Sequence, residues 1–318
     1  MLRMRYWCFL IAVVGFLEAQ TITPEFRYLY TLGSKDGIHP PRLGNRKSTT
    51  AVVGNGEHPY GLVYPVAVAT DARNRVWITD SGTASVHVFD RITGAYKEFR
   101  KTADGAFVQP SGIARDGQGR IYIVDSSLGS VFVFDEEGEY DRMLGHRNER
   151  LLEAPTWIAL SEDGKTVYVV DPPRKRIVEL NREGEEDSFI PLPDDLGVPM
   201  ALSVVENQIY VLGDHDHKVY IFSPGGKLRG EIKWDGIQYP AAFAWDRTHE
   251  RFAVANPRWM VVTLFNHEGT DLGSFCRAGD AADQVRRIDS LFVDPSGVIY
   301  VVASHDGKVL VFSEGSSH

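Results

Sequence analysis

Short apolar runs recur along this chain, separated by segments rich in glycine, aspartate and serine. Residues 110–145 show the pattern most clearly, with the sequence PSGIARDGQGRIYIVDSSLGSVFVFDEEGEYDRMLG. Ile121 and Ile123, and then Val131 and Val133, are two positions apart, which is the period of a half-buried β-strand. The intervening residues favour tight turns. The stretch therefore predicts four antiparallel strands, which we name a to d in chain order.

The four-strand pattern recurs in six copies. Four strands cannot bury their apolar face alone, so the copies must pack against one another. Periods of about 40–50 residues with four strands each are typical of β-propellers. We therefore expect an all-β fold, a six-bladed β-propeller of four-stranded antiparallel blades. The copies begin near Pro65, Pro110, Pro155, Pro199, Pro240 and Ile288.

The last copy has strands a, b and c but lacks a strand d. Residues 26–33 precede the first copy and end in Thr31-Leu32-Gly33, which matches Met143-Leu144-Gly145 in the second copy. We expect residues 26–33 to supply the missing outer strand of the last blade. This would close the ring and leave no long unpaired sheet edge.

The repeat resembles a known family. The pattern P-x-G-I-A-x-D, then G-x-I-Y-I-V-D-S, then V-x-V-F-D-x-x-G is similar to the NHL repeat, and the resemblance covers residues 26–313. It implies a six-bladed NHL-type propeller as a single domain over residues 20–318. Propellers of this type include lyases, lactonase relatives, ligand-sensing domains and interaction platforms, so the resemblance alone implies no single function.

The first residues predict export from the cytoplasm. Arg3 and Arg5 precede eleven apolar residues, and Leu17-Glu18-Ala19 is a plausible cleavage site, so we interpret residues 1–19 as a signal peptide. The mature protein would be secreted or periplasmic, and its single cysteine, Cys276, could form no intrachain disulfide. The net charge of −9 argues against nucleic acid as a partner. We also expect no membrane insertion, and a monomer.

The loops between strands b and c suggest where a ligand binds. They are small and neutral in the first two copies but charged or aromatic in the other four. They lie on the same rim as the long connections between blades, and long loops often carry function. Trp157 follows Pro155, the predicted start of a strand a, and could either stack a ligand at the channel mouth or pack between blades. The predicted ligand-binding residues are Trp157, Arg174, His215, His217, Arg258, Trp259 and His305.

The segment Asp214-His215-Asp216-His217 has the residue types that bind Zn²⁺. The resemblance extends to peptidyl-hydroxyglycine amidating lyases, whose metal-binding histidine lies two residues before the strand c valine, as His217 does before Val219. The other copies have no histidine there, so a three-histidine site cannot be assembled. We therefore favour a solvated polar loop and expect neither a bound metal nor a cofactor. The other residues at this position are Ala84, Gly129, Lys175, Trp259 and Gly307.

Aspartate recurs at the end of strand b. Asp80, Asp125 and Asp171 occupy this position in the first three copies, whereas Gly213 and Ala255 align with it in the fourth and fifth. Three carboxylates could suggest a catalytic ring. Aspartate also hydrogen-bonds turn backbone, however, so we expect these residues to be structural.

The sequence contains no complete catalytic set. We therefore predict a non-enzymatic, extracytoplasmic binding or scaffold propeller that engages a protein, peptide or glycan on the rim with the long loops. The alternative is a metal-dependent lyase or a lactonase-like hydrolase with its site at the channel mouth.

Overall fold

The structure is a computed structural model that describes residues 25–33, 61–145, 151–215 and 218–315. The predicted signal peptide, residues 1–19, lies outside the described residues, as does most of the connection before the first blade. Within the described ranges no helix is long and apolar enough to cross a membrane.

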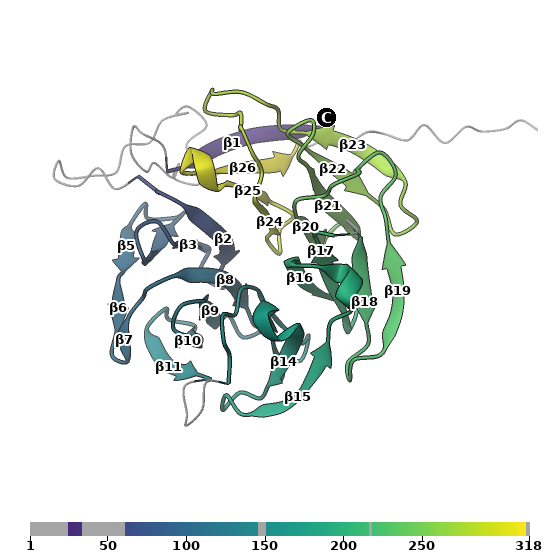
Figure 1. Ribbon diagram of the computed structural model, residues 1–318. Coiled ribbons are helices and arrows are strands. Elements are labelled where there is room, and N and C mark those ends of the chain that lie inside the picture. Colours follow the sequence, from purple (N-terminus) through teal and green to yellow (C-terminus); the bar gives the residue numbers. More distant parts are fainter. Residues whose placement is uncertain (1–24, 34–60, 146–150, 216–217, 316–318) are drawn as a thin grey trace, which may run out of the picture.

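Six four-stranded antiparallel sheets form the blades of a β-propeller, which confirms the predicted fold (Figure 1). Blade 1 contains β2 (Pro65–Thr70), β3 (Arg75–Asp80), β4 (Ser85–Asp90) and β5 (Tyr96–Phe99). Blade 2 contains β8 (Pro110–Arg115), β9 (Ile121–Asp125), β10 (Ser130–Phe134) and β11 (Tyr140–Leu144). Blade 3 contains β12 (Ile158–Leu160), β13 (Val167–Asp171), β14 (Arg176–Leu180) and β15 (Glu186–Pro191).

The second half of the ring has the same architecture. Blade 4 contains β16 (Pro199–Val205), β17 (Gln208–Gly213), β18 (Val219–Phe222) and β19 (Leu228–Ile232). Blade 5 contains β20 (Phe243–Asp246), β21 (Arg251–Asn256), β22 (Val261–Phe265) and β23 (Asp271–Phe275). Blade 6 contains β24 (Ser290–Val293), β25 (Ile299–Ala303), β26 (Lys308–Glu314) and β1 (Phe26–Leu32). The remaining elements are the small hairpin of β6 (Lys101–Thr102) and β7 (Gly105–Ala106), and the 3₁₀ turns η1 (Pro172–Arg174), η2 (Asp194–Leu196) and η3 (Ser304–Asp306).

The hydrophobic core is divided among the interfaces between neighbouring blades. Tyr122 and Val124 of β9 pack against blade 3, whereas Ile121 and Ile123 of the same strand pack against blade 1. Alternate side chains of a strand point to opposite faces of its sheet, so each middle strand is apolar on both sides. β9 and β10 are therefore buried on both faces, and the prediction of half-buried strands from the two-residue period is wrong for them.

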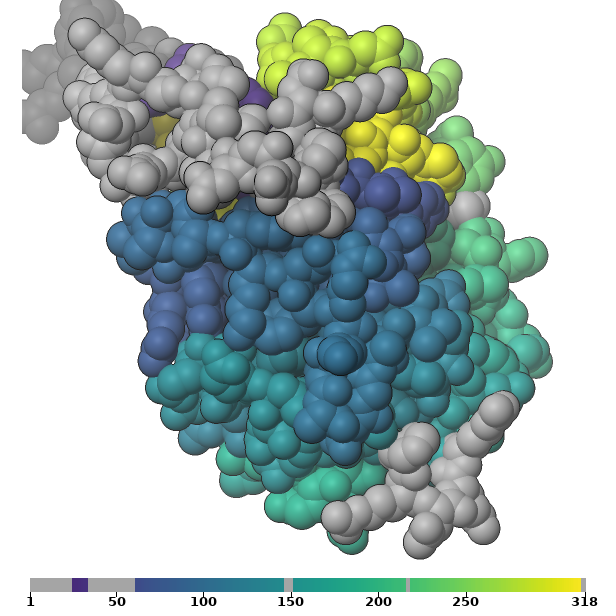
Figure 2. Space-filling model, turned by 90° about the vertical axis from the view of Figure 1, so that its left-hand side faces the viewer, coloured from purple at the N-terminus to yellow at the C-terminus, as the bar shows by residue number. Residues whose placement is uncertain are grey.

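The N-terminal strand closes the ring, as predicted from the sequence. In blade 6 the strand order is β1-β26-β25-β24, so β1 is the outer strand. Leu32 pairs with Val309 just as Leu144 pairs with Val131 in blade 2. Figure 1 shows the purple β1 beside the yellow β26, and Figure 2 shows the blue surface of blade 1 adjoining the yellow surface of blade 6.

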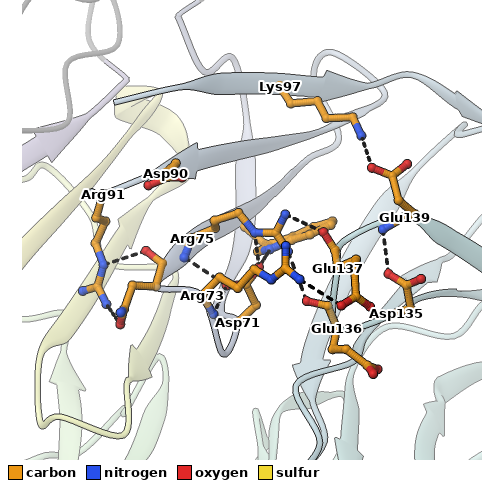
Figure 3. A network of polar contacts seen from close by, with 12 residues as sticks. Asp71, Arg73, Arg75, Asp90, Arg91, Lys97, Asp135, Glu136, Glu137 and Glu139 are labelled. Atoms are coloured by element: carbon orange, nitrogen blue, oxygen red, sulfur yellow. Dashed lines mark hydrogen bonds and ion pairs between the residues drawn. The ribbon is translucent and has the colours of Figure 1, made fainter. Parts of the chain in front are cut away.

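The lower rim, which carries the a–b and c–d turns, uses its polar groups to join blades. Asp71 accepts hydrogen bonds from the Arg75 guanidinium and from the Trp77 indole, at 2.8 Å for the indole. Arg75 also donates to the carbonyl of Glu137 in blade 2 at 2.7 Å, and Arg73 forms an ion pair with the Glu137 carboxylate at 2.8 Å (Figure 3). The side chains of Arg73 and Arg75 therefore form contacts across the interface between blades 1 and 2.

Arg91 makes the corresponding contact at the junction of blades 1 and 6. Its guanidinium donates to the Asn74 carbonyl of its own blade at 3.0 Å. It also donates to Asp294 at 3.1 Å and to the Tyr300 hydroxyl at 2.7 Å, both in blade 6. The first and last blades are thus joined by a buried ion pair as well as by their shared hydrophobic core.

The strand pairing corrects the sequence alignment in blade 5. Asn256 pairs with Val261 as Asp80 pairs with Ser85, so Asn256, and not Ala255, occupies the position of the repeated aspartate. The inner strands of blades 3, 5 and 6 also begin two or three residues after the predicted starts. Backbone bonds continue across some of this gap, because Val170 donates to the Trp157 carbonyl at 2.9 Å.

Candidate functional site

The repeated aspartates hold the upper rim, which we define as the b–c loops together with the connections from strand d to the next strand a. Asp80 accepts the amides of Val63 at 2.7 Å and Tyr64 at 3.0 Å from the incoming connection. It also accepts the Gly82 amide at 2.9 Å from the b–c loop. Asp125 and Asp171 make equivalent bonds, so the prediction that these aspartates bond the turns is confirmed.

Exposed apolar side chains gather on this rim. Of the eleven large hydrophobic side chains that are exposed in the described ranges, seven lie in its loops. The other four are in the c–d turn of blade 1 or on outer strands. Exposed apolar groups that cluster on one face of a soluble protein often mark an interaction site. The seven are Val63, Tyr64, Val108, Leu128, Val198, Tyr239 and Trp259.

Blade 5 contributes the most exposed aromatic residues of this set. Trp259 is 61 % exposed in the b–c loop, and Tyr239 is 58 % exposed in the connection that enters the blade. The Arg258 guanidinium lies 5.2 Å from the centre of the Trp259 ring. Arg258 and Tyr239 also line a cavity of about 460 Å³, which is within the usual range for ligand sites. The structure therefore places one predicted residue, Arg258, in the cavity wall and a second, Trp259, in contact with it.

The predicted residue of blade 6 lies beside another aromatic side chain. His305 is about half exposed, and its ring meets Tyr64 edge-on at 5.4 Å between centres. Its Nδ1 lies 3.8 Å from an Asp289 carboxylate oxygen. His305 and Tyr64 thus form a second aromatic contact on the upper rim, between blades 6 and 1.

The remaining predicted residues have different environments. Arg174 donates to the Leu151 carbonyl at 2.6 Å and lies 3.4 Å from Glu153, so it holds the connection between blades 2 and 3. His215 is exposed, and its amide donates to the Leu196 carbonyl at 3.4 Å. His217 lies outside the described residues.

Trp157 is half-buried and packs against two interfaces. It touches the cluster between blades 1 and 2 and also the cluster between blades 3 and 4. The adjoining strand approaches so closely that a side chain at Gly112 would meet the Thr156 carbonyl oxygen at 2.5 Å. Trp157 thus fills space where several inner strands converge.

A serine, a histidine and an aspartate meet inside blade 1. His87 Nε2 lies 3.1 Å from Ser85 Oγ and 3.7 Å from Asp80 Oδ2, while Nδ1 bonds the Tyr96 hydroxyl at 2.9 Å. In a nucleophilic triad the acid bonds the ring nitrogen that faces away from the serine. Here both contacts involve the same nitrogen, and Asp80, Ser85 and His87 are fully buried, so the arrangement is structural.

Cys276 has the wrong environment for a nucleophile at neutral pH. Burial raises the pKa of its thiol to about 11, whereas reactive cysteines have a lowered pKa. The described part of the chain also contains no group of three or more His, Cys, Asp or Glu side chains that could hold a metal ion. His217 lies outside the residues that were searched for such a group.

Sequence reasoning missed Tyr64, Tyr239 and Asn256. The two tyrosines precede Pro65 and Pro240 directly, so comparing the residues just before the repeat starts would have revealed them. Asn256 was hidden because its loop was aligned one position out of register.

No protein-family model matches the chain, and no curated protein matches it. Solved structures do match, and those described below have low sequence identity to the chain. Virginiamycin B lyase from Staphylococcus aureus is 13 % identical with a TM-score of 0.62, over 91 % of this chain and 99 % of the other.

Two further solved structures show the same likeness. A protein of unknown function from Bacteroides thetaiotaomicron is 15 % identical with a TM-score of 0.65, over 79 % and 70 % of the two chains. Hydrazine synthase from Kuenenia stuttgartiensis is 14 % identical with a TM-score of 0.59, over 84 % and 100 %. These likenesses establish the propeller fold alone, and the resemblance to the NHL family stays a prediction.

Proposed function

We propose that this protein is an extracytoplasmic, non-enzymatic propeller that binds a partner protein on its upper rim. The proposal rests on one observation: most of the exposed large hydrophobic side chains of the described residues lie in the loops of that rim. Several of them are aliphatic, such as Val63, Val108 and Val198, and aliphatic groups suit a protein surface better than a glycan. Export follows from the signal peptide predicted over residues 1–19.

A comparison of matched surface variants tests this function. The upper-rim variant carries Tyr239→Ser and Trp259→Ser, and the control carries Phe189→Ser and Leu228→Ser on outer strands. All four side chains are exposed, so neither pair should alter folding. Each purified protein is incubated with the extracytoplasmic fraction of the source organism, and retained proteins are identified by mass spectrometry. The identified partner is then produced and titrated by calorimetry.

We expect wild type and control to bind the purified partner equally. The upper-rim variant should lose at least tenfold in affinity, because exposed aromatic residues often dominate protein interfaces. Equal binding by all three proteins would exclude the upper rim as the interface.

A metal-dependent lyase or hydrolase is the second candidate. The segment 214–217 favours it, because it offers two histidines and two aspartates in four residues. The test is calorimetric titration of Zn²⁺ into wild type and into His217→Ala after chelator treatment. Micromolar binding that is lost in His217→Ala would favour this candidate over the binding propeller.

A further inference from the structure

The two loops that form the upper rim of blade 5 lack the links present in other blades. In blade 1, Asp80 accepts the amides of Val63 and Tyr64, and the Ser81 amide donates to the Tyr64 carbonyl at 3.1 Å. In blade 5, Asn256 replaces the aspartate and Pro257 replaces the serine. Asparagine loses one acceptor oxygen, and proline has no N–H to donate. Both kinds of link are therefore removed in the same blade.

The other blades all keep a carboxylate in this role. In each of the five, an aspartate at the end of strand b or in the b–c loop accepts a backbone amide from the incoming connection. Blade 5 is the exception within the described residues. The five aspartates are Asp80, Asp125, Asp171, Asp214 and Asp306.

The cavity in blade 5 lies between these unlinked loops and presents hydrogen-bond donors. Asn256 is only 6 % exposed and lines the cavity, where its Oδ1 accepts the Arg258 amide at 3.2 Å. Its NH₂ group has no partner among the described residues, nor has the backbone amide of Gln238, which corresponds to the Val63 amide. The Arg258 guanidinium forms no ion pair with a described carboxylate and stacks on Trp259.

We propose that this cavity binds a carboxylate group of the partner polypeptide. Asn256 is nearly buried and its NH₂ group lacks an acceptor, while Gln238 and Arg258 beside it are exposed to an incoming ligand; a carboxylate accepts several hydrogen bonds at once. A guanidinium prefers a carboxylate, which it can bind through two parallel bonds. The ligand carboxylate thus supplies the acceptor that an aspartate supplies in the other blades. The neighbouring rings of Tyr239 and Trp259 cover the apolar group that carries it.

This inference rests on the proposed binding function and deepens it. Four small probes separate the possible sources of the group. N-acetylphenylalanine has a terminal carboxylate, and N-acetylglutamate α-amide has a side-chain carboxylate. N-acetylphenylalaninamide has none, and glucuronic acid carries its carboxylate on a sugar. Dissociation constants come from NMR shifts of the Gln238 amide in the full-length protein.

We expect at least one of the two amino-acid carboxylates to bind about tenfold or more tightly than the uncharged amide. The stronger of the two identifies a chain terminus or an acidic side chain as the source. Binding of glucuronic acid alone would overturn the polypeptide assignment. Equal binding of the amide and the acids would overturn the carboxylate assignment.

Three variants connect the binding to the proposed donors. Asn256→Asp restores the aspartate of the other blades and adds a negative charge, so it should weaken probe binding at least tenfold without lowering the melting temperature. Arg258→Gln should weaken binding similarly. Lys175→Gln removes the same charge from the upper rim of blade 3, where Asp171 is present, and should bind as wild type does.

Undiminished binding by Asn256→Asp would overturn the inference. This failure is distinct from failure of the proposed function. If no carboxylate probe binds, but Tyr239→Ser with Trp259→Ser still loses the partner, then the carboxylate inference is wrong and the binding function stands.

Discussion

His87 shows how a single titratable residue is accommodated inside a blade. It is fully buried in β4 and hydrogen-bonds with hydroxyl groups at both ring nitrogens. Burial lowers the pKa of its imidazole, while the charges of Asp80 and Glu98 raise it and that of Arg100 lowers it. The pKa in the folded protein therefore lies below the ordinary value near 6.5, so the ring is neutral at pH 7.

This environment predicts that stability falls in mild acid. Below about pH 6.5 the unfolded state gains the His87 proton before the folded state does, so the unfolding free energy decreases as pH falls from 7 to 5. The slope from this residue is at most about 1.4 kcal/mol per pH unit. Urea denaturation of wild type and His87→Gln at pH 7.5, 6 and 5 measures the change of the unfolding free energy with pH.

Glutamine keeps hydrogen-bonding groups but does not titrate. The difference in unfolding free energy between wild type and His87→Gln therefore removes the contribution of every other titrating group. We expect the stability of wild type relative to the variant to decrease on acidification. A difference that stays constant from pH 7.5 to 5 would show that His87 does not carry this dependence.

At the scale of elements, the aspartate link between loops is the recurrent device of the upper rim. Asp125 is fully buried and accepts amides of Val108, Gln109, Ser127 and Leu128. Asp125→Asn should lower the unfolding free energy by about 2–3 kcal/mol, because one acceptor becomes a donor that faces other donors. Chemical denaturation with the linear extrapolation method measures the change.

The matched change in the opposite direction is Asn256→Asp in blade 5, which should leave stability unchanged or raise it. If Asp125→Asn were as stable as wild type, the link would contribute little, and its absence from blade 5 would need another explanation.

The sequence predicts the strands and their repeat, but it leaves the register of one loop undetermined. Val261 and Val262 are consecutive, and aligning the first with Val86 places Ala255 opposite Asp80. Pairing between strands selects Val262 instead, since it faces Phe275 as Val86 faces Phe99. A one-residue shift of this kind depends on which residues of the neighbouring strands pair, and the loop sequence alone does not determine that.

The candidate site could be predicted only in part, for a similar reason. Arg258 and Trp259 were predicted because the residue types of the b–c loops change from small and neutral in the first two copies to charged or aromatic in the later ones. The cavity depends on the absence of a hydrogen-bonded link between the connection at Gln238 and the loop at Asn256. Its donors, Asn256 and the Gln238 amide, become visible only when six blades are compared in the same register.

At the scale of the whole molecule, β1 holds the first and last blades together. It pairs with β26 from Phe26 to Leu32, and Leu32 is fully buried in the cluster between blades 6 and 1. Deleting residues 26–32 removes this pairing and exposes the edge of β26. We expect the deleted protein to lose its cooperative thermal transition in calorimetry.

Addition of a peptide with the sequence of residues 25–33 provides the control. The peptide should bind the exposed edge of β26 and restore a cooperative transition, because pairing across an antiparallel ladder requires no covalent connection. A deleted protein that melts at the wild-type temperature without the peptide would contradict the role of β1.

The pairing of β1 with β26 also determines how the ring responds to mechanical load. Phe26 faces Glu314, and the Gly315 amide donates to the Glu25 carbonyl at 2.6 Å, so both strands run outward at the same end of the ladder. A force that pulls these two ends apart loads the rungs one after another, from Phe26 toward Leu32. The propeller therefore opens at its closing blade by unzipping, at a lower force than shearing the whole ladder would require.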